Sequence, residues 1–568
     1  MNYNPRRLFI ASCLALITSA FSFQMRQDSG DDFRTVFNLT QEMVGSVMGG
    51  QFLGMASSML VFSFLCDALG MGRVLFLAWI CHALGISGTI FAEPLSGQAF
   101  AGPMGSALAS ASDWMTNTFK WSLLPEVGGN NTSFWVLCTA AFLSGAGIGL
   151  VEIAINPLAA TLYPDNKTHK LNVLHAWWPG GLILAGVLAQ FFVNPLYNRA
   201  AEFFGYKLEP AAIGLTSLVD RAQIWQFKYG LVAVPLVLYG LLAAGQRFPG
   251  TERVQANVST GAMLLQILRP LFIIWAFCML LTASTELGTN TFMESILRRT
   301  TKSPQFPDGI SGTVIFIYTS FLMFVLRFFA GPLVHRFSPI GLLFLCSILT
   351  AGGLYGLSMA NNPVLAFGAA TIFGIGIAYY WPTMLGVTAE RFPKGGALAL
   401  GLIGCVGNLA ISQATTQIGR VYDSGTVAAL ASDFRSASVT TATGEPVPLV
   451  TQGPVPRVPP QAEEFLFPGG GKKLDPRAVT ALNELFEDQK KKNPDAPVPE
   501  ELQAVRNAEA AGASFALTRI AVMPIALIAI FGLIGLVDKL RGGYKQVHLL
   551  PAPRSELPPV IWPKDLPK

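Results

Sequence analysis

Long apolar stretches that almost lack Asp, Glu, Lys and Arg recur along this chain of 568 residues. Charged residues make up only 13% of the chain, about half of the roughly 25% typical of soluble proteins. An apolar stretch of about 20 residues can cross a bilayer as a helix, and a helix satisfies its own backbone hydrogen bonds there. We therefore predict an all-α integral membrane protein whose twelve transmembrane helices lie near residues 7–25, 42–66, 73–92, 133–160, 174–194, 228–246, 269–291, 310–333, 339–359, 364–388, 396–418 and 515–538.

The twelve predicted helices divide into two related halves. The fourth helix carries Asn156-Pro157 near its end, and the tenth carries Trp381-Pro382 at the corresponding place. In both, a charged turn and a Gly-rich helix follow, and transporters are often built from two such repeats. The predicted parts are two six-helix bundles at 1–246 and 269–538, a cytoplasmic linker at 247–268, a cytoplasmic tail at 539–568, and external insertions at 93–132 and 421–514.

The second insertion is the largest soluble segment. Residues 444–460 are rich in proline, which predicts an extended, polyproline-like strap. Asp475 followed by Pro476 is typical of a helix start, an N-cap with proline in the first turn, so we predict a helix that ends near Lys492. Pro499 and the two Glu residues after it predict another helix that continues into the last membrane span.

Lys and Arg residues set the expected orientation. They are more numerous on the side of the two termini than in the short loops of the other side, which hold Arg26 and Arg34 among others. Because cytoplasmic loops are enriched in Lys and Arg, we predict a multi-pass protein of the plasma (inner) membrane with both termini cytoplasmic. Arg6 and Arg7 before an apolar run also resemble a signal peptide. Its removal would break the repeat, so we interpret this segment as a retained first helix.

Several function classes are disfavoured by the composition. The net charge of +5 is too small and too spread out to favour nucleic-acid binding. The five His residues are scattered, the seven Cys residues lie in apolar stretches, and no Walker-type phosphate-binding motif occurs. We therefore predict no enzyme activity, no metal site and no cofactor.

Three sequence patches resemble one family of transporters. Glu152 lies four residues before Asn156-Pro157, Lys170-Leu171-Asn172 follows in the next turn, and Tyr380-Trp381-Pro382 precedes a Gly-rich helix. Together they resemble the fucose permease branch of sugar–proton symporters in the major facilitator superfamily, over the membrane body but not the insertions. The resemblance implies the two-bundle major facilitator fold, a sugar-like substrate and proton symport.

We predict three proton-coupling residues. Glu152 lies deep within the fourth helix, where an ionised carboxylate costs several kcal/mol, so this group can take up and release a proton. Its alternative role is a carboxylate locked by one partner. Asp28 lies one residue from the position where the family has an acid in helix one. The alternative is that Asp28 belongs to a solvated loop. His175 and Trp178 stand where the family has Gln and Asn in helix five, and His175 is either a proton relay or an interfacial residue.

The predicted substrate site combines amides, acids and aromatic rings. Amides and carboxylates bond sugar hydroxyls, and aromatic faces pack on the apolar C–H faces of sugars. Glu286 lies among Gly and Thr residues that suggest a locally opened helix. Aromatic residues are also ordinary anchors at membrane interfaces. The predicted substrate-binding residues are Asn156, Trp177, Trp178, Glu286, Asn290, Tyr379, Tyr380, Trp381 and Asn408.

Three further residues are predicted to act in gating. Asp67 and Arg73 belong to a turn that is similar to the superfamily's inner-turn motif, and Arg327 is similar to an inner-gate arginine that pairs across the halves. We therefore predict a monomeric secondary transporter that moves a small polar solute, a sugar, together with protons across the lipid bilayer. A proton-driven exporter of drugs or organic ions, and a non-transporting membrane sensor, remain alternatives.

Overall fold

The computed structural model describes residues 3–29, 41–92, 132–189, 224–289, 312–440, 444–452, 472–493 and 496–549, with a few isolated residues between them. Within these residues, eleven helices are long and apolar enough to cross a membrane. The expected span at 310–333 corresponds to a helix with a shorter apolar part, Ile317–Phe328. Each predicted span therefore meets a helix, and the all-α membrane fold is confirmed. The predicted insertion at 93–132 lies outside the described ranges.

The described part of the N-terminal group consists of six long helices. These helices are apolar on most sides, so apolar side chains are buried where the helices pack together and are exposed on the surface that faces lipid. The helices are α1 (Pro5–Asp28), α3 (Gln41–Leu69), α4 (Met71–Ile90), α7 (Thr132–Leu162), α8 (Lys167–Leu188) and α10 (Ile224–Ala243), with a short 3-10 turn, η2 (Pro164–Asn166), between α7 and α8.

Two short helices, α11 (Glu252–Gln255) and α12 (Thr260–Ile267), lead to the C-terminal group. Here the expected seventh span contains a π-helical turn, and the expected tenth and twelfth spans are each made of two consecutive helices. The elements are α13 (Pro270–Ala283), η4 (Ser284–Gly288), α15 (Gly312–Phe328), α16 (Ala330–Ser358), α17 (Pro363–Ile377), α18 (Tyr380–Arg391), η5 (Pro393–Gly395), α19 (Gly396–Ala429), α23 (Glu500–Ile520) and α24 (Val522–Leu540).

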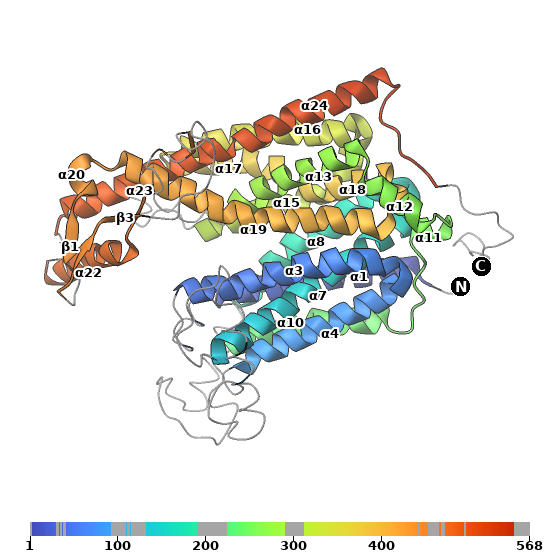
Figure 1. Ribbon diagram of the computed structural model, residues 1–568, viewed down its shortest axis with the longest axis horizontal. Coiled ribbons are helices and arrows are strands. Elements are labelled where there is room, and N and C mark those ends of the chain that lie inside the picture. The colour runs from blue at the N-terminus through green and yellow to red at the C-terminus, as the bar shows by residue number, and fades with distance from the viewer. Residues whose placement is uncertain are drawn as a thin grey trace.

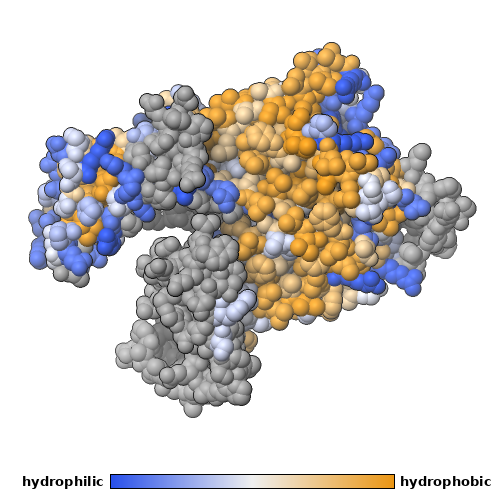
Figure 2. Space-filling model, in the orientation of Figure 1, coloured by the Kyte–Doolittle hydropathy of each residue, from blue (hydrophilic) through white to orange (hydrophobic). Residues whose placement is uncertain are grey.

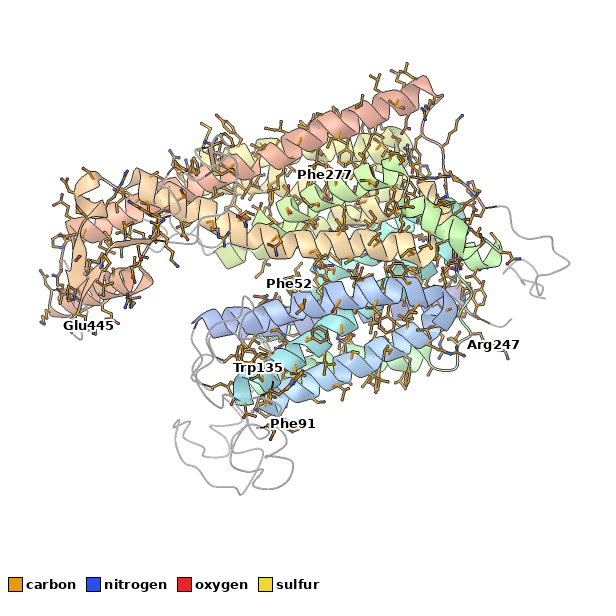
Figure 3. The ribbon with its side chains drawn as sticks, in the orientation of Figure 1. Phe52, Phe91, Trp135, Arg247, Phe277 and Glu445 are labelled. Carbon is orange, nitrogen blue, oxygen red and sulfur yellow. The ribbon has the colours of Figure 1, made fainter. Side chains whose placement is uncertain are left out.

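The two groups lie side by side, and the start of α1 and the end of α24 lie at the same end of the molecule (Figure 1). We call this end the termini side and the opposite end the cap side. A broad hydrophobic band crosses the middle of the molecule between hydrophilic ends (Figure 2). Glu445 and Arg247 lie at opposite ends, whereas Phe277, which is 51% exposed, lies within the band (Figure 3). This surface is that of a protein that crosses a bilayer.

The described residues between 430 and 499 form a small folded unit, which we call the cap, at the end of α19 and the start of α23 (Figure 1). Helix α19 runs past its expected end at 418. Helix α23 begins at Glu500 and leads into the last span, which confirms the helix predicted after Pro499, so two membrane helices extend directly into the cap. The cap elements are α20 (Ser432–Arg435), β1 (Ser438–Thr440), β2 (Pro446–Pro448), β3 (Val450–Gln452), β4 (Lys472–Leu474) and α22 (Pro476–Lys492).

The cap differs in part from the predicted strap. Strand β1 pairs with β2 and β3 pairs with β4, both antiparallel, so residues 446–448 and 450–452 lie in paired strands. Residues 453–460 of the predicted strap lie outside the described residues. The predicted helix is confirmed: the Asp475 side chain accepts a hydrogen bond from the backbone N–H of Arg477, and the helix ends at Lys492. Leu449 of the cap and Val505 of α23 are fully buried in one apolar core that the two share.

Small residues set the distance between helices in the N-terminal group. A Cβ atom on Gly145 of α7 would lie 1.9 Å from the Gln51 carbonyl oxygen of α3, and one on Gly54 would lie 2.1 Å from the Phe142 carbonyl oxygen. Only glycine fits at these two positions, because the two backbones are in contact there. Such close contact replaces the hydrophobic effect as the source of helix association inside a membrane.

Candidate functional site

A chain of buried polar side chains crosses from one helix group to the other. In the N-terminal group, the Asn156 amide Nδ2 lies 3.5 Å from Glu152 Oε2, one turn away on α7. The Asn156 oxygen Oδ1 lies 2.9 Å from Nε2 of His175 on α8, so a protonated Nε2 donates to it. All three side chains are at most 6% exposed. The α7 and α8 helices therefore hold an acid, an amide and an imidazole in one series.

Arg327 of α15 continues this series into the C-terminal group. Its Nη1 donates to the His175 carbonyl oxygen at 2.7 Å, and its Nε donates to the Ala378 carbonyl oxygen at 2.6 Å. Its Nη2 lies 3.3 Å from Oε1 of Glu286, in the π-helical turn η4. We call Glu152, Asn156, His175, Glu286 and Arg327 the central network.

Prolines explain why Arg327 finds two backbone acceptors. A helical carbonyl normally accepts a bond from the N–H four residues later, and proline has none. Pro179 follows His175 by four residues, and Pro382 follows Ala378 by four, so both carbonyl oxygens lack their usual partner. The guanidinium supplies the missing donors. One proline from each helix group thus leaves a carbonyl oxygen available to Arg327.

Glu286 keeps one free oxygen in this arrangement. Its Oε2 is buried and has no hydrogen-bond partner in the described part of the chain, and the residue is 5% exposed. A buried carboxylate oxygen without a donor is costly, so the site favours either a proton or an incoming hydroxyl group there. Glu286 is therefore suited to receive a polar ligand or a proton next to Arg327.

The predicted aromatic residues fall into two sets. Trp177 packs edge-on against Phe324 and Phe328 of α15, with ring centroids 5.6 and 6.2 Å apart, and so joins the two groups. Trp178 instead contacts Phe23 of α1, with centroids 5.7 Å apart. The two neighbouring tryptophans thus face different partners.

The tenth-helix aromatics mostly serve packing within the C-terminal group. The Tyr379 hydroxyl donates to the Leu326 carbonyl oxygen at 2.7 Å, and the Tyr380 hydroxyl donates to Ser347 Oγ at 3.2 Å. Trp381 lies against Gly407 of α19, where a Cβ atom would be 2.7 Å from its ring. Both tyrosine hydroxyls are therefore already hydrogen-bonded within the C-terminal group.

The remaining predicted site residues are separate from the central network. The Asn408 amide donates to the Gly404 carbonyl oxygen at 3.0 Å and lies 3.4 Å from Met59 Sδ, across the two groups. Asp28 pairs with Lys228 of α10, with Nζ and Oδ2 2.6 Å apart. Asn290 lies outside the described residues.

The termini side is closed by a second set of contacts between the groups. The Thr168 hydroxyl of α8 donates to Glu390 Oε1 of α18 at 2.6 Å, and its backbone N–H donates to the same oxygen at 3.2 Å. The tail follows: the Tyr544 hydroxyl donates to Glu390 Oε2 at 2.6 Å, and Gln546 donates to the Pro164 carbonyl oxygen at 2.7 Å. Burial raises the pKa of Tyr544, so its hydroxyl stays protonated and remains a donor.

Of the other two gating candidates, the structure places only Asp67 in this closure. Its carboxylate accepts bonds from Arg253 Nε at 2.6 Å and from the Thr251 hydroxyl at 2.7 Å, both in the linker. Arg73 is exposed, and its Nη1 donates to the Leu69 carbonyl oxygen at 3.3 Å, one turn before it. Asp67 therefore fixes the linker to the end of α3.

Sequence reasoning missed the residues of this closure. Thr168 and Glu390 flank the charged turns of the two repeats, and this position was the only sequence signal that could have marked them. Tyr544 and Gln546 lie in a tail without any recognisable motif. The described residues contain no group of three or more His, Cys, Asp or Glu side chains placed to hold a metal ion.

A profile of the Major Facilitator Superfamily matches residues 7–415. The chain belongs to this superfamily. Members of the superfamily are transporters, so this chain is a multi-pass membrane transporter and not an enzyme. No curated protein sequence matches it.

Solved structures share the superfamily fold at low sequence identity. The proton:xylose symporter XylE of E. coli is 15% identical, with a TM-score of 0.54 over 72% of this chain and 87% of that one. The transporter FucP in its outward conformation is 16% identical, with a TM-score of 0.50 over 72% and 91%. A bacterial homologue of the human lysosomal transporter Spinster is 13% identical, with a TM-score of 0.53 over 94% and 97%.

Proposed function

We propose that this superfamily member moves a small polar solute, a sugar, together with protons by alternating access. We further propose that it acts in the plasma (inner) membrane with both termini in the cytoplasm, since Lys and Arg favour that side. The observation that carries the proposal is the central network, which puts one buried acid in each helix group and joins them through Asn156, His175 and Arg327.

This arrangement suits coupling between a proton and a solute. Asn156 uses its amide nitrogen on Glu152 and its oxygen on His175, so a sugar hydroxyl that binds Asn156 competes with the Glu152 contact. Solute binding and protonation of Glu152 are then linked, because an ionised carboxylate that loses its donor inside the membrane is costly. Glu286, whose Oε2 has no hydrogen-bond partner among the described residues, offers an acceptor for a hydroxyl group on the other side.

Alternating access requires the two helix groups to separate on the termini side. The described conformation is held closed on the termini side by the Thr168–Glu390 contacts and deeper by the bond from Arg327 to His175. Opening toward the termini must break both. One proton moving down a potential of 100 mV supplies about 2.3 kcal/mol, enough for a solute gradient of roughly thirty- to fiftyfold.

The test is uptake of labelled sugars into proteoliposomes under an imposed pH gradient, with Glu152→Gln beside the wild type. The variant keeps the shape but carries no proton. We expect it to lose gradient-driven accumulation to the level of empty vesicles while it retains counterflow exchange of the same sugar. Glu501→Gln, the same change at an exposed position of α23, serves as the control and should behave as wild type.

Three results would count against the proposal. Normal accumulation by Glu152→Gln would remove this residue from coupling and move the search to Asp28 or His175. Transport of organic cations or drugs out of inverted vesicles, without sugar uptake, would favour the exporter. Absence of any transport, with solute binding retained, would favour a sensor.

A further inference from the structure

The interior of the N-terminal helix group contains a second buried polar region, away from the central network. Seven polar side chains from α1, α3, α4 and α7 are each 0% exposed. We call them the polar seam: Ser19, Ser22, Arg26, Gln51, His82, Thr89 and Ser144. A buried seam of this kind inside a transmembrane helix group is costly unless its members are fully hydrogen-bonded.

The spacing of the α1 members of the polar seam places them on one face of that helix. Ser19, Ser22 and Arg26 are three and four residues apart, so they lie on one face of α1. Helix α4 runs alongside in a constant register: His82 Nε2 lies 3.3 Å from Ser19 Oγ, and Thr89 Oγ1 lies 3.3 Å from Arg26 Nη2, with the same offset of 63 residues. The seam therefore runs along the axis of the helix group.

Helix α7 and helix α3 close the seam from the other side. Ser144 Oγ accepts a second bond from Arg26 Nη2, at 3.2 Å. Its neighbour Gly145 lies against the backbone of Gln51, so Gln51 of α3 is next to this stretch of α7, and the Gln51 side chain is fully buried there. Tyr229 of α10 lies on a further side, with its ring centroid 5.9 Å from the Arg26 guanidinium carbon. Arg26 is thus enclosed by helices.

Arg26 carries a charge that no described residue around it balances. Within the described part of the chain it forms no ion pair, and its Nε and Nη1 are buried without a hydrogen-bond partner. The same is true of both amide atoms of Gln51, of Ser22 Oγ and of His82 Nδ1. Six unpartnered atoms in one seam, around an unneutralised guanidinium, indicate that an occupant belongs there.

The chemistry of these atoms defines the occupant. A water molecule could satisfy single donors but would leave the positive charge buried and unbalanced, which is the larger cost. An anion balances the charge and accepts bonds from guanidinium, amide and hydroxyl donors. The occupant must also be small, because the helices touch at Gly145 and because a Cβ atom on Gly85 would lie only 2.3 Å from Ser144 Oγ.

We propose that the polar seam binds one small monovalent anion, of chloride or bromide size, against the guanidinium of Arg26. Arg26 supplies the charge, and Gln51 Nε2 and Ser22 Oγ supply further donors. The site lies within one helix group and does not depend on the proposed transport of a sugar.

The test is equilibrium binding of radioactive chloride to the purified full-length protein in detergent, with gluconate used to hold the ionic strength constant. We expect saturable binding of one chloride per chain, with displacement by bromide and none by gluconate. Arg26→Gln should abolish saturable binding, and Arg6→Gln, the same change at an exposed position of the same helix, should leave it unchanged.

Two further measurements keep the proposal decidable if Arg26→Gln fails to fold. Gln51→Leu leaves the charge but removes an amide donor, so it should weaken chloride binding severalfold. Bromide soaked into crystals of the wild type should give an anomalous peak beside Arg26. Absence of saturable chloride binding, unchanged binding in Arg26→Gln, or a bromide peak only elsewhere would each overturn the proposal, and the first would leave the seam to water.

Discussion

Two arginines are buried in the two halves of this protein, and their surroundings differ. Arg327 and Arg26 are 3% and 0% exposed. Arg327 contacts a carboxylate and two carbonyl oxygens, whereas Arg26 contacts two hydroxyls and leaves two nitrogens unpartnered. The first is neutralised by a carboxylate of this chain, whereas no described residue neutralises the second.

The difference has its origin in the local sequence. The carbonyl oxygens that hold Arg327 are available because Pro179 and Pro382 lack the N–H groups that would otherwise occupy them. No proline lies four residues after Ser144, so α7 keeps its backbone bond there. Among the described residues, Arg26 contacts the hydroxyls of Thr89 and Ser144 and the ring of Tyr229, and no carbonyl oxygen. A buried charge without compensation points to a ligand, and one with compensation points to a mechanical or coupling role.

The largest expected effect is at the compensated arginine. Arg327→Gln leaves Glu286 buried without its partner, and removal of one member of a buried pair costs about 3–5 kcal/mol of folding free energy. The double variant Arg327→Gln with Glu286→Gln should recover most of this loss. Reversible unfolding in mixed micelles measures both, with Arg336→Gln as an exposed control that should change little.

Additive losses in the double variant would contradict this reading of the pair. They would show that the bonds from Arg327 to the His175 and Ala378 carbonyl oxygens, and not the contact with Glu286, carry the stability.

Substitution of Arg26, the uncompensated arginine, should not lower the stability of the protein in the absence of halide. In halide-free buffer, Arg26→Gln removes two hydrogen bonds worth about 1 kcal/mol each, together with an unbalanced buried charge that costs several kcal/mol. We therefore expect unchanged or increased stability relative to wild type in the same unfolding measurement. In chloride, the order should reverse, because only the wild type gains from the bound anion. A clear loss of stability without halide would mean that Thr89 and Ser144 already compensate the charge.

The two arginines also show what could be predicted from the sequence. Arg327 lies in the middle of an apolar stretch, so its burial follows from composition alone. Arg26 was assigned to an external loop because the first span was predicted to end at residue 25. Helix α1 continues to Asp28, and this extension of less than one turn takes Arg26 into the interior. Span ends depend on tertiary packing, and composition does not record that packing.

The same distinction between local and long-range signals holds elsewhere. The start of α22 was predictable because Asp475 and Pro476 act within one helical turn. The pairing of β1 with β2 and the contact between Thr168 and Glu390, 222 residues apart, depend on distant segments meeting and left no local signal. The link from Asn156 to His175 was not predicted either, although both residues were selected singly.

The smallest expected effect concerns a charge that water already compensates in part. Asp475 accepts from the backbone N–H of Arg477 at 2.9 Å, and the Arg477 side chain, 68% exposed, lies 3.1 Å away. Asp475→Ala should destabilise the start of α22 by about 1 kcal/mol, as for other N-caps. Hydrogen exchange of the α22 amides in the full-length protein measures this effect, and Asp488→Ala in the middle of the same helix should change exchange less.

The pH dependence of that effect follows from the contacts of the carboxylate. Hydrogen bonds from Arg477 hold the pKa of Asp475 below its ordinary value, so the folded state favours the ionised form. The stabilisation is therefore complete above the usual Asp pKa of about 3.9 and is lost as the pH falls through the lower folded-state pKa. The difference in exchange between wild type and Asp475→Ala should be constant from pH 7 to about 5 and should shrink below about 4. A constant difference down to the lowest pH would show that the cap acts through the shape of the side chain.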